Sequence, residues 1–190
     1  MRTCSTKNLI TASCCWLGLG LTVLLSGCAS VSVQSVRDPS FSNPTHNLFI
    51  VVNHDQLDTV DPAYTQYLVP ALKTEFEQRG IQTQIRVINP LALDESVYLS
   101  EIASYKPDGV LTIVANGCVV SPYGGAEQIN YDISLFDPTR TRRIWRAKVL
   151  ASGGTAVREK RMKLMAQDLV KRMSDEKLIS SEPRKTGVNL

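Results

Sequence analysis

Residues 110–115, Val110-Leu111-Thr112-Ile113-Val114-Ala115, form the most strand-like run in the chain. The run is almost continuously apolar and rich in β-branched residues, which is typical of a strand buried on both faces of a sheet. Lys106-Pro107-Asp108-Gly109, directly before it, has the composition of a turn. We therefore expect residues 110–115 to be a central strand, with the other elements arranged around it.

Two strands are predicted upstream of this run. Residues 48–52 (LFIVV) are apolar and rich in β-branched side chains, which indicates a second buried strand. Residues 81–87 alternate apolar and polar side chains, a pattern typical of a strand with one wet face. We expect this last strand to lie near an edge of the sheet.

Two helices are predicted between these strands. Apolar residues recur at helical spacing over residues 64–76. Asp61 has the side chain of a helix cap, and Pro62 suits the first helical turn. Pro70 falls inside the apolar pattern and predicts a kink or a break there. A shorter helix is expected over about residues 94–105.

A hairpin and a helix are predicted downstream. Residues 129–135 and 145–149 alternate apolar and polar side chains, and Asp137-Pro138-Thr139-Arg140 between them indicates a turn. Beyond Gly153-Gly154, apolar residues recur at i, i+3, i+4, i+7, i+8 and i+11, which predicts an amphipathic helix with a buried stripe. The stripe consists of Met162, Met165, Ala166, Leu169, Val170 and Met173.

Together these elements predict a single α/β domain over residues 48–180. Their order is β-α-β-α-β-β-β-α, which fits a mixed sheet of about five strands with helices packed on it. The chain has 190 residues, of which 43% are hydrophobic and 21% are charged. This composition excludes a wholly disordered chain and a multi-span membrane protein. Residues 181–190 are expected to be a loose polar tail.

Residues 1–27 are predicted to be a cleaved signal peptide. A short basic segment precedes an apolar core over residues 16–25, which is too short for a mature membrane span of about 20 residues. Leu25-Ser26-Gly27-Cys28 resembles the lipobox of bacterial lipoproteins. The resemblance implies cleavage between Gly27 and Cys28, a diacylglyceryl group on the Cys28 thiol and an acyl chain such as palmitate on the new amine. An ordinary secretory signal with a chance cysteine is the alternative.

The residue after the cysteine bears on localisation. Ala29 stands where aspartate favours inner-membrane retention in lipoproteins of the enterobacterial type. The resemblance therefore implies anchoring in the outer membrane, with the domain facing the periplasm. Residues 28–47 are rich in Ser, Val, Pro and Asn without a helical period, and we predict that they form a lipidated flexible tether.

A family resemblance covers most of residues 48–178. It rests on the lipobox, the order of elements, the segment Pro107-Asp108-Gly109-Val110-Leu111 leading a strand, and an Ile-Trp pair at Trp145 after the hairpin turn. These features resemble the small periplasmic lipoprotein domains of the curli-secretion and penicillin-binding-protein-activator type. The resemblance implies a domain that binds an envelope protein or assembles with itself, and it carries over no catalytic residue.

An alternative reading makes the chain a small envelope hydrolase or transferase. If the first and third strands are parallel, His54 and Cys118 lie just beyond the same sheet edge, where open α/β sheets bind ligands. Asp55 or Asp58 would orient the imidazole, and the thiol would be the nucleophile. One Cys and one His define no motif, so we favour an inert thiol and a loop histidine, and predict no enzyme. A module that binds lipid or glycan fragments is a third possibility.

No metal and no cofactor beyond the covalent lipid on Cys28 is predicted. A zinc site needs three or four ligands. His54 and Asp55 supply a pair, but His46 is the only other histidine in the chain. Nucleic acid is not expected as a partner either, because the signal sends the chain out of the cytoplasm.

Charge is segregated along the chain. Residues 139–172 hold eleven Lys and Arg against two Asp and Glu, whereas residues 28–138 hold five against thirteen. The hairpin cations could contact an acidic partner or lipid phosphates, and a solvated face neutralised by the acidic half is the alternative. The predicted contact face consists of Arg140, Arg142, Arg143, Arg146 and Lys148. Further cations are expected to decorate the last helix: Arg158, Lys160, Arg161, Lys163, Lys171 and Arg172.

Overall fold

A computed structural model describes residues 29–53, 63–88, 96–122 and 125–180 of the chain. Predictions that concern Gly27, Cys28, His54, Asp61 or Pro62 lie outside these residues. The sheet strands are β1 Ser30–Arg37, β2 Asn47–Asn53, β3 Gln82–Ile88, β4 Gly109–Val120, β5 Ala126–Phe136 and β6 Arg143–Ser152. The helices are α2 Ala63–Gln78, α3 Ser96–Tyr105 and α4 Arg158–Asp175, with the short 3-10 helix η2 Thr155–Val157 before α4.

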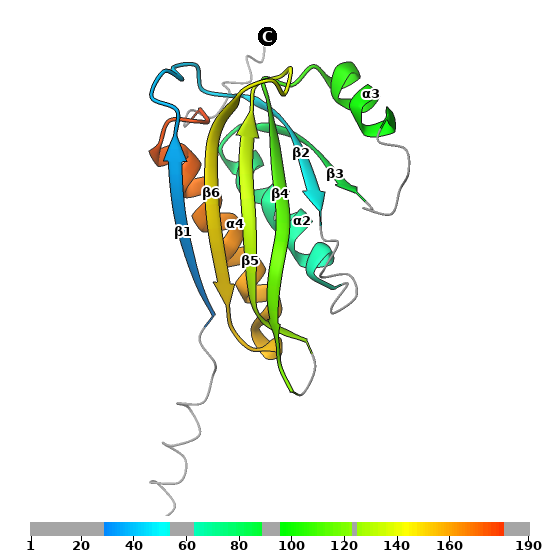
Figure 1. Cartoon of the computed structure of the whole chain (residues 1–190), viewed down its shortest axis with the longest axis vertical. Coiled ribbons are helices and arrows are strands. Elements are labelled where there is room, and N and C mark those ends of the chain that lie inside the picture. Colours follow the sequence, from blue (N-terminus) through cyan, green and yellow to red (C-terminus); the bar gives the residue numbers. More distant parts are fainter. Residues whose placement is uncertain (1–28, 54–62, 89–95, 123–124, 181–190) are drawn as a thin grey trace, which may run out of the picture.

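The strands form one mixed sheet in the order β1-β6-β5-β4-β2-β3 (Figure 1). β2 runs parallel to β3 and β4, and the remaining neighbours are antiparallel. The predicted α/β class is therefore confirmed. The interior position predicted for the strand at residues 110–115 is also confirmed. The edge position predicted for the strand at residues 81–87 is confirmed as well.

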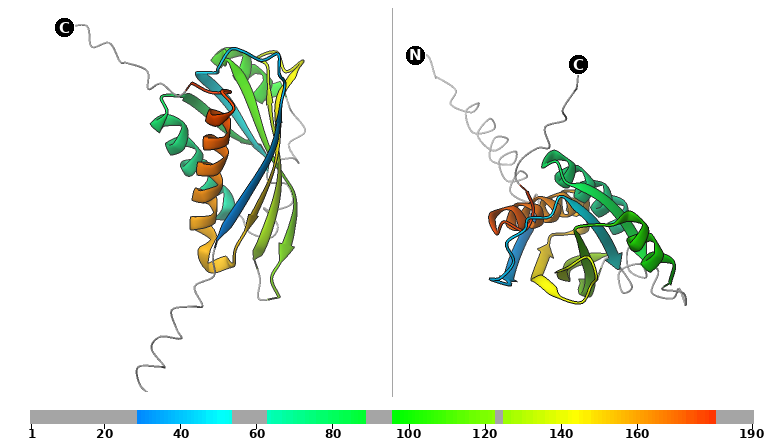
Figure 2. Two further views of the ribbon diagram at one scale, coloured as in Figure 1. Left: turned by 90° about the vertical axis from the view of Figure 1, so that its left-hand side faces the viewer. Right: turned by 90° about the horizontal axis from the view of Figure 1, so that it is seen from above.

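The main core lies between one face of the sheet and two helices. Figure 2 shows α2 and α4 side by side on that face. The predicted apolar stripe of α4 is fully buried from Met162 to Met173, and α2 contributes Tyr64, Leu72 and Phe76 to the same core. Because both helices bury an apolar side against the strands, the sheet and the helix pair exclude water together.

The opposite face of the sheet is only partly covered. α3 packs Ile102 there against Phe49, Val51 and Val110, and Tyr105 meets the Phe49 ring edge to face at 6.0 Å between centroids. No described helix lies over the same face of β1, β6 and β5. We call the exposed and half-buried residues there the uncovered face: Ser32, Gln34, Val36, Asn116, Asn130, Asp132, Arg146, Lys148 and Leu150.

The predicted tether is wrong for residues 30–47. Residues 30–37 (SVSVQSVR) form β1, which pairs antiparallel with β6 over its full length, so the sheet has six strands instead of five. Val31 and Val33 pack against the core. Thr45 is 1% exposed and donates its hydroxyl to the Leu178 carbonyl at 2.9 Å. The segment that follows Cys28 is therefore part of the folded domain.

A kink or a break was predicted at Pro70; α2 runs through it, so the break is wrong and the kink stays a prediction. Pro70 lies on the exposed side of α2, as does Gln66, whose carbonyl loses its helical hydrogen bond. Water can satisfy that carbonyl, which explains why the helix continues.

The packing of β1 on the core predicts that two substitutions on this strand have unequal effects on stability. Val33→Ala removes methyl groups from a side chain packed on the core and should lower the free energy of unfolding by about 1 kcal/mol. Val36→Ala on the same strand, where Val36 is 76% exposed, should change it by less than about 0.5 kcal/mol. Urea unfolding of the mature protein in mild detergent measures both values. Equal effects at the two positions would indicate that β1 does not pack on the core.

Candidate interaction surfaces

The five cations of the predicted contact face lie at two places along β6 and the turn before it. Arg146 and Lys148 belong to the uncovered face, in the middle of β6. Arg140 and Arg142 belong to the turn between β5 and β6, and Arg143 begins β6 at that same end of the sheet. Position along the strand therefore separates the set into two groups, and a single contact face that includes both groups stays a prediction.

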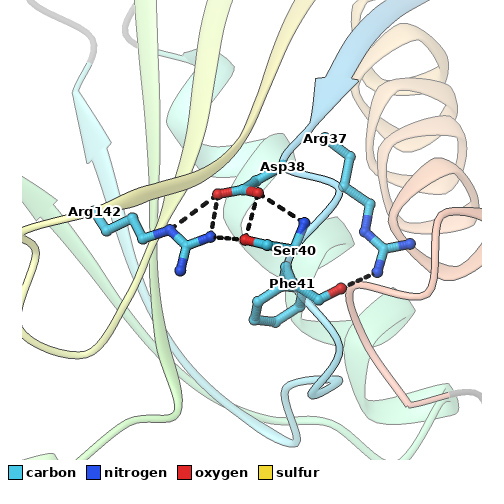
Figure 3. A network of polar contacts seen from close by, with 5 residues as sticks. All are labelled: Arg37, Asp38, Ser40, Phe41 and Arg142. Atoms are coloured by element: carbon cyan, nitrogen blue, oxygen red, sulfur yellow. Dashed lines mark hydrogen bonds and ion pairs between the residues drawn. The ribbon is translucent and has the colours of Figure 1, made fainter.

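Arg142 is held by the segment that follows β1. Its Nε donates to Asp38 Oδ2 at 2.9 Å, and Nη2 contacts Asp38 and Ser40 (Figure 3). Asp38 Oδ1 also accepts from the Ser40 hydroxyl at 2.7 Å and from the Ser40 backbone N–H at 2.9 Å. The Arg142 hydrogen bond first, and then those of Ser40, lower the pKa of Asp38 to about 2. The group is exposed, so water and salt screen the pair.

The other two arginines at this end stack on aromatic rings of their own domain. The Arg140 guanidinium lies 5.5 Å from the centre of the Tyr98 ring, and that of Arg143 lies 5.3 Å from the Phe136 ring. Asp137 fixes the turn by accepting from the Thr141 backbone N–H at 2.8 Å. These arginines therefore tie the turn to α3 and β5.

The uncovered face presents a connected polar surface. Arg146 Nη2 lies 3.3 Å from Asp132 Oδ1, and the Asn116 amide donates to the other oxygen of the same carboxylate. Asn116 lies at a register shift between β4 and β5. Beside it is a hollow of about 260 Å³ whose polar lining comes from several strands. Its exposed polar residues are Ser32, Gln34, Asn116, Asn130 and Lys148.

Sequence reasoning missed this surface for a specific reason. The hairpin was predicted to have one wet face, but Ser32 and Gln34 stood in the predicted tether. Only the pairing of β1 with β6 places them beside Lys148 and Leu150. The available signal was the alternation of Val with Ser over residues 30–33, which is too short to predict a strand by itself.

Of the predicted cysteine site, the described residues include Cys118 alone. β2 and β4 are parallel, as that hypothesis required, and Asn53 at the end of β2 pairs with Val114. Cys118 is not in a loop beyond the sheet edge, because β4 continues to Val120. It lies about 13 Å further along β4 than Val114, at 3.3 Å per residue. Its side chain is half-buried and packs against the core, and the structure does not describe His54.

Arg161 departs from the predicted exposed face of α4. It is fully buried, and its guanidinium donates to the Ala126 and Glu127 carbonyls at 2.8 Å each and also contacts the Gly153 carbonyl. The Tyr64 ring lies 5.0 Å from the guanidinium carbon. A buried cation needs such partners, because losing its hydration is costly. Arg161 therefore joins α4 to β5, β6 and α2 and is unavailable to a partner.

Two further findings concern the described residues as a group. They include no cluster of three or more His, Cys, Asp or Glu side chains that could hold a metal ion. Within the same part of the chain, no helix has the length and apolarity needed to cross a membrane.

Comparisons with known proteins concern the fold alone. Neither family models nor curated protein sequences match the chain. Among solved structures, the PelC dodecamer from Paraburkholderia phytofirmans is 12% identical, with a TM-score of 0.47, over 79% of this chain and 99% of that chain. Lipoprotein GNA1162 from Neisseria meningitidis is 11% identical, with a TM-score of 0.36, over 68% and 98%. A PDZ domain protein from Parabacteroides distasonis is 12% identical, with a TM-score of 0.35, over 88% and 42%.

The Asp38–Arg142 pair predicts a pH dependence of stability. Because the folded-state pKa of Asp38 is about 2 against an ordinary value of 3.8, the contribution is fully present above about pH 4 and is lost as the pH falls through about 2. Asp38→Asn should flatten the profile of thermal midpoint against pH in this window. Arg142→Met should bring the pKa of Asp38 toward 3.8, which carboxyl NMR titration would detect. Unchanged profiles in both variants would contradict the pairing.

Proposed function

We propose that this chain is a lipid-anchored envelope protein that acts without catalysis, as an adaptor, activator or assembly factor that contacts other proteins. In this proposal Cys28 is cleaved free and acylated at the lipobox, and the domain faces the periplasm from the outer membrane. The observation that carries the proposal is the start of β1 at Ser30, two residues after the lipobox cysteine. An acyl anchor at Cys28 would hold the sheet directly against the bilayer.

The length of β1 sets the distance between the proposed anchor and the other surfaces of the domain. Eight residues at 3.3 Å each make β1 about 26 Å long, and it runs from the Cys28 end toward the turn that holds Arg142. If the strands run away from the membrane, the turn that holds Arg142 lies too far from the bilayer to contact lipid phosphates. The uncovered face would then extend from the bilayer into the periplasm, within reach of a neighbouring membrane protein.

The chemistry of the uncovered face favours a protein partner. Its amides, hydroxyls and paired charges can hydrogen-bond a polar surface, and the hollow beside Lys148 gives that surface a shape to match. An anchor also confines the domain to one membrane, which raises its effective concentration for partners there. Self-assembly is a second form of the same proposal, because β1 and β3 are the edges of the described sheet and can accept another strand.

The anchor is tested by replacing each cysteine of the mature chain in turn. Cys28→Ala should abolish the acyl mass of the purified protein and move it from the membrane fraction to the soluble envelope fraction. Cys118→Ala is the matched control and should leave both properties unchanged, because that side chain lies within β4. Intact-protein mass spectrometry and fractionation provide the readouts. Acyl mass that persists in Cys28→Ala would contradict the lipid anchor at Cys28.

The contact surface is tested by site-specific photo-crosslinking in intact cells. A benzoylphenylalanine at Gln34, on the uncovered face, should form an adduct with one envelope protein or with a second copy of the chain. The same group at Lys171, on the solvent side of α4, should not. Lys148→Glu should weaken the Gln34 adduct several-fold while circular dichroism stays native. Equal adducts at both positions, or none at Gln34, would exclude the uncovered face as the contact.

A further inference from the structure

The chain next to the lipobox is fixed on one end of the domain. Ala29 packs on Gly153, where an added Cβ would lie 3.1 Å from the Ala29 Cα. Gly153 has a φ of +143°, a conformation that suits glycine. The next residue, Ser30, pairs with Ser152. Cys28 is therefore one peptide bond from a residue held against the end of β6.

The strand register brings two valines to the same end of the sheet. Ser152 pairs with Ser30 on one side and with Gln128 on the other, and Gln128 pairs with Val119. Three strand spacings of about 4.8 Å place Val119 about 14 Å across the sheet from Ser30. Figure 1 shows the end of β4 and the start of β5 extending beyond the start of β1 on this side.

These two valines are adjacent exposed apolar residues at the end of β4. Val119 is 51% exposed and Val120 is 49% exposed, and the exposed Pro122 follows them. The uncovered face further along the same strands presents mainly amide, hydroxyl and charged groups. Apolar side chains gain free energy when they leave water for the acyl boundary of a bilayer. Lys160, exposed in the first turn of α4 at this end, is suited to lipid phosphates.

We propose that the end of β4, at Val119, Val120 and Pro122, is a second membrane contact that enters the lipid surface beside the acylated Cys28. This inference rests on the proposed function, because the acyl chains bring the bilayer to this end of the sheet. Two attachment points across the sheet fix the tilt of the domain, which a single lipid anchor leaves free. The contact thereby determines the direction in which the uncovered face points.

The test places an environment-sensitive fluorophore at either end of the sheet. Val120→Cys and Val36→Cys are matched substitutions, each in a Cys118→Ala background, labelled with a nitrobenzoxadiazole group. The acylated proteins are reconstituted in vesicles of phosphatidylethanolamine and phosphatidylglycerol, with and without brominated acyl chains. The label at position 120 should shift its emission to the blue and be quenched by bromine. The label at position 36 should show neither effect.

The outcomes separate this inference from the proposed function. Vesicle flotation and intact mass report the acyl anchor independently of the label. A protein that floats while its position 120 label emits as in water overturns the membrane contact and leaves the anchor standing. A protein that carries no acyl mass and does not float overturns both. Val119→Ser should reduce the quenching at position 120 without altering flotation or circular dichroism, and unchanged quenching there would exclude a contribution from Val119.

Discussion

The antiparallel ladder between β1 and β6 is the constraint on which the rest of the arrangement depends. It runs from Ser30 paired with Ser152 to Arg37 paired with Trp145, and polar or steric contacts secure both ends. At one end Ala29 packs on Gly153, and at the other the Asp38 backbone N–H donates to the Ile144 carbonyl at 2.9 Å. If Cys28 is acylated as proposed, this ladder would couple the anchor to a rigid sheet. Strand length then sets how far along the sheet each surface lies from the Ser30 end.

α4 is held to this sheet at both of its ends by a charged side chain. Near its start, Arg161 satisfies backbone carbonyls at the ends of β5 and β6. Just beyond its end, Glu176 accepts from the Trp145 indole at 2.6 Å and from Arg172 at 2.8 Å, and Ser35 of β1 joins the group. The apolar stripe between them stabilises the packing of α4 on the sheet, but burial is non-directional and does not fix where the helix lies. The hydrogen bonds of the two charged groups select one position of α4 along the sheet. If the helix shifted, Arg161 or Glu176 would lose its partners and remain as a poorly hydrated charge. This cost fixes both ends of α4 on the sheet.

The sequence predicted the parts of the fold that have strong periodicity and missed those that depend on pairing. The run at residues 110–115 and the stripe from Met162 to Met173 are long enough to identify a central strand and a buried helix face. β1 has only two inward valines, so its assignment depends on β6, which lies more than one hundred residues away. Arg161 lies four residues before Met165, on the buried stripe. It was nevertheless predicted to be exposed, because it is charged. The candidate contact surface was missed with β1, because two of its polar residues, Ser32 and Gln34, come from that strand.

Acidic and basic residues that are segregated along the chain lie next to one another in the folded domain. This arrangement bears on how the domain can recognise a partner. Asp38 and Asp132 belong to the acidic part of the sequence and Arg142 and Arg146 to the basic part, but the ladders of β6 bring them together as ion pairs. Within each pair the opposite charges largely cancel at a distance, which weakens the attraction of these two arginines for an acidic surface. Recognition must then rely on short-range hydrogen bonds and on shape, which require a partner already close by. The proposed anchor would meet that requirement by confining the domain to the membrane of its partner.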